Sequence, residues 1–175
     1  MRKESEEETF ATALNCMDGR VQEVVASWTK KHFNVRYVDA VNEPGIDRLI
    51  KADESYFKYV FHTWKEIIYL LKCLLPWNYT RFVNYDICNI PPDSNIVRRK
   101  LMISIDGHGS KGIVICGHHN CSGNPISKEE HQEEIRIFCE EVENNWNLPV
   151  PIYGLWIDKV DEGWQVAKVV HTPQK

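Results

Sequence analysis

The sequence predicts an α/β fold with a mostly parallel central sheet flanked by helices. Short apolar stretches alternate with segments whose apolar residues recur at helical spacing, which is typical of parallel strands joined by crossover helices. Clusters of polar residues directly follow two of the predicted strands, and open α/β sheets form their sites beyond the carboxyl ends of strands. The length of 175 residues fits one domain, so we expect a single domain over residues 1–175.

The first part of the sequence predicts a strand, a helix and a second strand. Residues 9–15 are a short apolar stretch that leads directly into Cys16. Residues 35–41 predict a strand, which the following Pro44-Gly45 pair would end. Between them, residues 21–33 predict an amphipathic helix because side chains of one face recur at helical spacing: Val21, Val24, Val25, Trp28 and His32.

The middle of the sequence predicts a helix followed by a strand. Residues 94–106 have a helical pattern with Asp93 or Ser94 as the cap. Residues 107–112 are rich in glycine and predict a turn. Residues 113–116 are a compact apolar stretch, and we expect a strand there that ends before His118.

The last part predicts a helix and two strands. Ser127 and Glu130 have the spacing of a capping box, which marks the start of a helix. Residues 151–158 and 164–170 predict two strands joined by a turn at residues 161–163. The helix has one apolar face that we expect in the core: Ile135, Phe138, Cys139, Val142 and Trp146.

The composition argues against several classes of function. The formal net charge is −4 and charges of both signs are mixed along the chain, so we expect no nucleic-acid partner. Residues 1–8 are charged rather than typical of a secretory signal, and the most apolar stretch, residues 67–77, is far shorter than a membrane helix. We therefore expect a cytoplasmic protein without membrane contact. In that reducing compartment, cysteines spaced with histidine are better interpreted as metal ligands than as disulfides.

Two motifs supply the residues of a metal site. Cys16 lies in the pattern Cys-x-Asp-x-Arg, and His118 and Cys121 lie in the pattern Gly-His-x-x-Cys. Two thiolates and one imidazole suit zinc in tetrahedral geometry and leave a fourth position for water or substrate, which is the arrangement of a catalytic zinc site. We therefore predict that Cys16, His118 and Cys121 bind Zn²⁺.

Asp18 and Arg20 are the predicted catalytic residues. Asp18 can accept a hydrogen bond from a water in the fourth position, and Arg20 can hold Asp18 in a bidentate ion pair. With the pair intact, Asp18 orients the nucleophile. With the pair broken, Asp18 could take the fourth position and close the site. Both states remain open at this point, as does a structural zinc site that Asp18 closes permanently.

His119, Cys116 and Cys139 are further residues of types that bind metals. Adjacent residues rarely point at one metal ion, so we expect His119 to face solvent or to support the ligands from outside. A role for His119 in proton transfer remains open. Cys116 and Cys139 fall in apolar segments, and we expect both in the core rather than at the metal.

The two motifs resemble those of the β-class carbonic anhydrases. In that family the cysteines and the histidine bind zinc and the Asp–Arg pair controls the fourth position, which carries over to the five residues named above. The stretches NCMDGRVQ, HGSKGIVICGHHNCSGNP and IYGLWID are similar to a compact branch of carbonic-anhydrase-like proteins. The resemblance implies a β-carbonic-anhydrase-like α/β sheet, a homodimer or higher homo-oligomer, and a lyase that hydrates carbon dioxide to bicarbonate by zinc-bound hydroxide.

Two other functions remain open beside this one. A zinc hydrolase acting on carbonyl sulfide or carbon disulfide would use the same ligands on a similar linear electrophile. A non-catalytic zinc-binding protein would keep the site closed with Asp18.

Residues 51–92 differ from the rest of the chain, since they contain no glycine and are rich in aromatic side chains. The segment looks like an insertion relative to the compact branch. It could form a dimer contact or cover the core, act as a lid over the metal site, or pack poorly and weaken the fold.

Activity should rise from neutral toward alkaline pH. The charges of two thiolates cancel that of the zinc ion, so water at this site is acidified less than water beside three neutral histidines. Stopped-flow measurement of carbon dioxide hydration as a function of pH tests this expectation. A flat profile between neutral and alkaline pH would contradict it.

Overall fold

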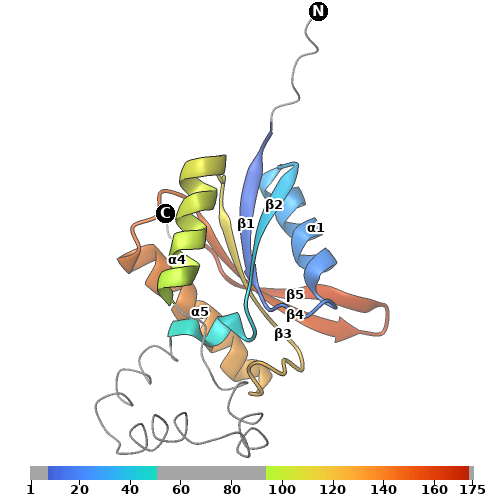
Figure 1. Ribbon diagram of the computed structural model, residues 1–175. Coiled ribbons are helices and arrows are strands. Elements are labelled where there is room, and N and C mark those ends of the chain that lie inside the picture. The colour runs from blue at the N-terminus through green and yellow to red at the C-terminus, as the bar shows by residue number, and fades with distance from the viewer. Residues whose placement is uncertain (1–7, 51–93, 174–175) are drawn as a thin grey trace, which may run out of the picture.

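The computed structural model describes residues 8–50 and 94–173, so the predicted insertion at 51–92 lies outside the described residues. Within the described ranges, five strands form one sheet in the order β2-β1-β3-β4-β5 (Figure 1). Strand β5 (Gly163–His171) is antiparallel to its neighbour. The other four are parallel: β1 (Phe10–Asn15), β2 (Tyr37–Asn42), β3 (Ile113–His118) and β4 (Ile152–Val160). The predicted α/β fold with a mostly parallel sheet is confirmed.

Helices cover both faces of this sheet. Figure 1 shows α1 (Gln22–Phe33) on one side, and α4 (Ser94–Met102) and α5 (Lys128–Asn145) on the other. The Ser127 capping box opens α5 as predicted. Of the two caps expected for α4, Asp93 lies outside the described residues. No helix in the described ranges is long and apolar enough to span a membrane.

Two shorter helical turns complete the described elements. A turn of π-helix, η4 (Ile103–Gly107), continues α4, so the helix predicted over residues 94–106 is present with a changed last turn. A 3-10 turn, η1 (Ile46–Arg48), follows β2. The third strand is longer than predicted: it pairs with β4 as far as His118, which therefore ends the strand instead of following it.

Side chains of the sheet alternate between two apolar cores. Leu14 and Ile115 pack with residues of α4 and α5, whereas their neighbours Ala13 and Cys116 pack with residues of α1. This alternation follows from the two-residue period of a strand, and strands covered on both faces are apolar throughout. The predicted apolar face of α5 is buried in the first core: Ile135, Phe138, Cys139, Val142 and Trp146.

A buried hydrogen bond supports the edge of the sheet at which β3 ends. Asp47 in η1 and His131 in the first turn of α5 are each 2% exposed, and the imidazole Nδ1 donates to the carboxylate. The carboxylate lies against Gly117, where a Cβ atom would come within 2.7 Å of Asp47 Oδ2. Because buried polar groups are costly unless hydrogen-bonded, this pair fixes η1 to α5 at the end of β3.

The variant His131→Leu should lose on the order of 3–5 kcal/mol of stability, because it leaves a buried carboxylate without its donor. The exposed pair of His108 and Asp39 offers a matched control. Its His108 Nδ1 lies 2.7 Å from the Asp39 carboxylate. His108→Leu should cost no more than about 1 kcal/mol. Urea unfolding at neutral pH measures both, and equal losses would contradict the role assigned to the buried pair.

Candidate metal centre

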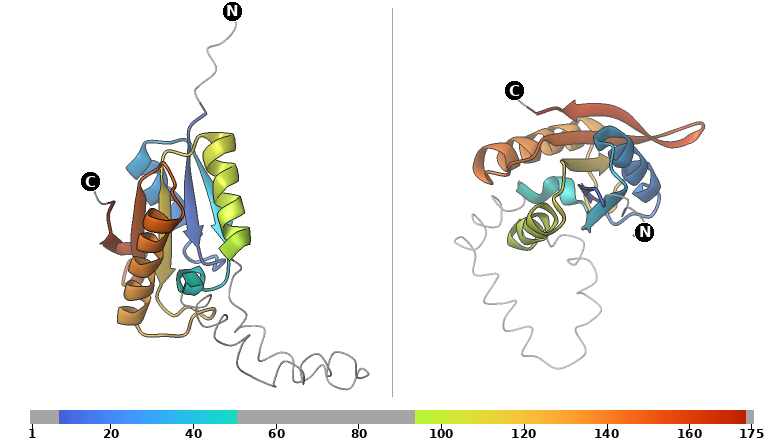
Figure 2. Two further views of the ribbon diagram at one scale, coloured as in Figure 1. Left: turned by 90° about the vertical axis from the view of Figure 1, so that its left-hand side faces the viewer. Right: turned by 90° about the horizontal axis from the view of Figure 1, so that it is seen from above.

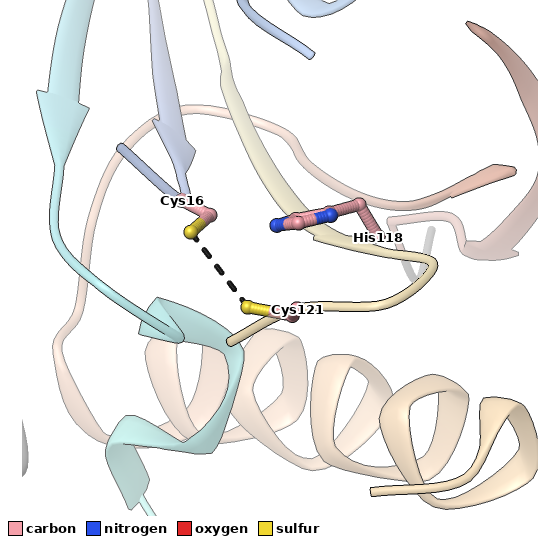
Figure 3. Close-up of side chains that lie close together, drawn as sticks. All are labelled: Cys16, His118 and Cys121. Carbon is pink, nitrogen blue, oxygen red and sulfur yellow. Dashed lines mark hydrogen bonds between the residues drawn. The ribbon is translucent and has the colours of Figure 1, made fainter. Parts of the chain in front are cut away.

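Three candidate ligands converge where β1 and β3 end side by side. Cys16 directly follows β1, His118 is the last residue of β3, and Cys121 lies in the turn after it. All three are buried, and their ligand atoms lie within 4.8 Å of one another (Figure 3). Across residues 8–50 and 94–173, this is the one such group of histidine, cysteine or acidic residues. The structure therefore brings together the residues that the two motifs nominate.

The distance between the two sulfur atoms fits a zinc ion. Cys16 Sγ and Cys121 Sγ are 3.7 Å apart. Two Zn–S bonds of about 2.3 Å at the tetrahedral angle would place their sulfur atoms about 3.8 Å apart.

The tautomer of His118 also suits a metal ligand. Its Nδ1 donates to the carbonyl oxygen of His119 over 3.0 Å, so Nε2 carries the lone pair. Nε2 is buried and has no hydrogen-bond partner among the described residues. Figure 3 shows the ring pointing toward the two sulfur atoms. A buried nitrogen without a partner is costly, and a metal ion at this point would satisfy it.

The two cysteines differ in pKa, and Cys16 ionises more readily than Cys121. The hydrogen bond from Cys121 lowers the pKa of Cys16 well below its ordinary value against the opposing effect of burial, with smaller contributions from His118 and the backbone of Gly45. The Cys16 thiolate in turn raises the pKa of Cys121 above its ordinary value. Burial opposes a charge on His118, but interaction with the Cys16 thiolate outweighs burial and raises the pKa of that imidazole. A cation bound between the sulfurs would relieve the repulsion that keeps the second thiol protonated.

Asp18 is paired with Arg20 in this structure. Arg20 Nε donates to the two carboxylate oxygens over 2.9 and 3.0 Å, and Nη2 and the backbone N–H of Arg20 donate as well. These bonds lower the pKa of Asp18 to about 2, so at neutral pH the group is an ionised acceptor. Asp18 is not among the converging ligands. Of the two arrangements that the sequence left open, the structure has the one in which the Asp–Arg pair is intact.

Two residues that sequence reasoning missed hold the turn from Cys16 to Asp18. Gln22 Nε2 donates to the carbonyl oxygens of Cys16 and Asp18 over 2.7 and 2.8 Å. Asn15 Nδ2 donates to the Cys16 carbonyl and to Gln22 Oε1, each over 2.9 Å. An asparagine at the end of an apolar strand was the available signal, since a buried amide needs partners.

Two glycines bring the loop after β2 into contact with the turn that carries Cys121. Gly45 has φ +56°, and a Cβ atom on it would lie 2.5 Å from the carbonyl oxygen of Gly123. A Cβ atom on Gly123 would lie 2.6 Å from the backbone nitrogen of Gly45. Only glycine permits this approach of two backbones. It places the loop after β2 against the turn that carries Cys121.

His119, Cys116 and Cys139 lie where the sequence predicts. The side chain of His119 is 55% exposed. Cys116 and Cys139 are buried in the two cores. Neither cysteine belongs to the group of converging ligands.

The variant Gly123→Ala should weaken zinc binding by on the order of tenfold or more, since residues that orient ligands have effects of that size. The added methyl group would collide with the backbone beside Gly45 and displace Cys121. Gly19→Ala is the matched control, because a Cβ atom there meets nothing within 4 Å. Competition titration with a zinc chelator measures both affinities. Equal affinities in the two variants would contradict the role of the glycine contact.

Comparison with known proteins identifies a matching family. A family model described as "Putative carbonic anhydrase" matches residues 6–64 and 90–170, which include the three candidate ligands and the Asp18–Arg20 pair. No curated protein matches the chain. The family match covers most of the sequence, and the chain therefore belongs to the putative carbonic anhydrase family.

Proposed function

We propose that this protein is a zinc lyase that hydrates carbon dioxide to bicarbonate. Cys16, His118 and Cys121 would hold the Zn²⁺ ion. The observation that carries the proposal is the ion pair of Asp18 with Arg20, because a carboxylate that is bound to Arg20 and is not among the converging ligands favours an open fourth position. Membership of the family supports the same reaction.

The role of Asp18 follows from its charge state. A zinc ion held by Cys16, His118 and Cys121 would supply a Lewis acid that lowers the pKa of bound water. Asp18 stays ionised at neutral pH because Arg20 lowers its pKa to about 2, so it accepts a hydrogen bond and does not donate one. An acceptor on one side of the attacking oxygen directs its O–H bond, which turns a lone pair toward the carbon of carbon dioxide.

Arg20 keeps that acceptor in place. Besides binding the carboxylate, its Nη2 donates to the carbonyl oxygen of Asn120 over 3.3 Å, which ties Arg20 to the turn between His118 and Cys121. Arg20 therefore links the Asp18 carboxylate to the turn that carries Cys121. Such fixed geometry lowers the entropic part of the barrier.

The family resemblance also implies an assembly and a location for this protein. We expect a homodimer or higher homo-oligomer in the cytoplasm, with carbon dioxide and bicarbonate as the small-molecule partners. Light scattering coupled to size-exclusion chromatography on zinc-loaded protein measures the assembly.

Stopped-flow hydration of carbon dioxide by metal-quantified protein tests the reaction. We expect turnover with about one zinc ion per chain, as the three-ligand site requires. Cys121→Ala should abolish both zinc binding and turnover. Cys116→Ala, which removes a buried thiol of the same segment that is not a ligand, should keep both. Full zinc occupancy without turnover would favour a carbon dioxide analogue as substrate or a non-catalytic zinc site.

Asp18→Ala separates the enzyme from the closed zinc site. If Asp18 orients the nucleophile, turnover should fall by on the order of a hundredfold while zinc affinity is kept. If Asp18 is a permanent fourth ligand, zinc affinity and thermal stability should fall together, which would refute the proposed role.

A further inference from the structure

Trp164 lies outside both motifs and contacts Arg20 of the Asp18–Arg20 pair. It lies near the start of β5 and pairs with Lys159 across the hairpin that β4 and β5 form. In Figure 2, viewed from above, this hairpin extends beyond the other strands. The guanidinium carbon of Arg20 lies 4.9 Å from the centroid of the Trp164 ring. The same ring is 6.2 Å from that of His118, with an interplanar angle of 71°.

Arg20 therefore has partners from three separate segments. Asp18 belongs to its own turn, the Asn120 carbonyl belongs to the turn after β3, and Trp164 belongs to the hairpin. A planar guanidinium on an aromatic face keeps its N–H groups directed outward in the plane, where they can bind a carboxylate and a carbonyl together. The ring thus selects the orientation of Arg20 that the two hydrogen bonds need.

The ring contact matters because the polar contacts of Arg20 are exposed to solvent. Its side chain is 43% exposed, and exposed ion pairs are weak because they order long side chains and compete with water. Trp164, in contrast, is partly buried and packs against the core that contains Val21 and Ile157. The aromatic ring is thus the more rigid member of the pair.

We propose that Trp164 is a positioning residue that holds Arg20 in the orientation in which Arg20 keeps Asp18 away from the metal position. This inference rests on the proposed function, since it concerns the fourth position of the same site. Without the ring, Arg20 samples other orientations and releases Asp18 more often. The freed carboxylate then competes with exogenous ligands for the metal.

Azide binding to the cobalt-loaded protein, followed by visible absorption, tests the proposal because azide needs an open fourth position. Trp164→Leu should weaken azide binding by about two- to tenfold, the size expected for loss of a cation–π contact that sets an open–closed equilibrium. Trp164→Phe, which keeps an aromatic face, should retain most of the affinity. Trp28→Leu is the control, because the ring of Trp28 stacks on His32 of α1 at 4.3 Å.

A second substitution separates positioning from packing. Adding Asp18→Ala to Trp164→Leu should restore azide affinity, because closure needs the carboxylate. A purely structural effect of Trp164→Leu would persist in the double variant. Unchanged azide affinity in Trp164→Leu, or no recovery in the double variant, would overturn the proposal. Normal azide binding in a wild-type protein that does not hydrate carbon dioxide would count against the proposed function alone.

The contact itself can be measured without metal. The ring current of Trp164 should shift the Nε–H proton signal of Arg20 upfield, and Trp164→Leu should remove that shift. An Arg20 signal that is the same in both proteins would overturn the proposal even where a variant binds cobalt poorly.

Discussion

Burial of two sulfur atoms and one imidazole nitrogen at a single point is the constraint on which the surrounding structure depends. Polar groups removed from water need partners; here a hydrogen bond links the two thiols, while His118 Nε2 has no partner among the described residues. The strands fix this arrangement, because parallel pairing of β1 with β3 puts Cys16 and His118 at the same edge of the sheet. The site is thus a result of topology, completed by the turn that carries Cys121.

Residues around the ligands limit how far that turn can move. The two glycine backbones join it to the loop after β2, and the Asp47–His131 hydrogen bond joins η1 to α5 behind β3. In addition, Asn124 Nδ2 donates to the buried Glu134 carboxylate over 2.7 Å, which ties the end of the turn to α5. Supports of this kind set ligand orientation, and losing one typically weakens metal binding by about 10- to 100-fold.

The grouping of Cys16, His118 and Cys121 and most of the fold could be predicted because their signals are local. Strand and helix periods, the Ser127 capping box and the spacing of the two motifs are each contained in a short stretch of sequence. The Asp47–His131 and Arg20–Trp164 contacts could not be predicted, because they join residues far apart in the chain whose meeting depends on packing. The length of β3 was underestimated for a similar reason, since pairing with β4 carries it on to His118.

The candidate ligands also span a large part of the chain, since Cys121 lies 105 positions after Cys16. An ion held by both would cross-link the first strand to the third, and the unfolded chain would lack the assembled site. Ligand binding that is confined to the folded state adds about 2.7 kcal/mol of stability when the free ligand is a hundredfold above its dissociation constant. Persistence of the folded chain would then depend on the supply of free zinc, so metal scarcity would reduce the number of folded molecules as well as the occupancy of each.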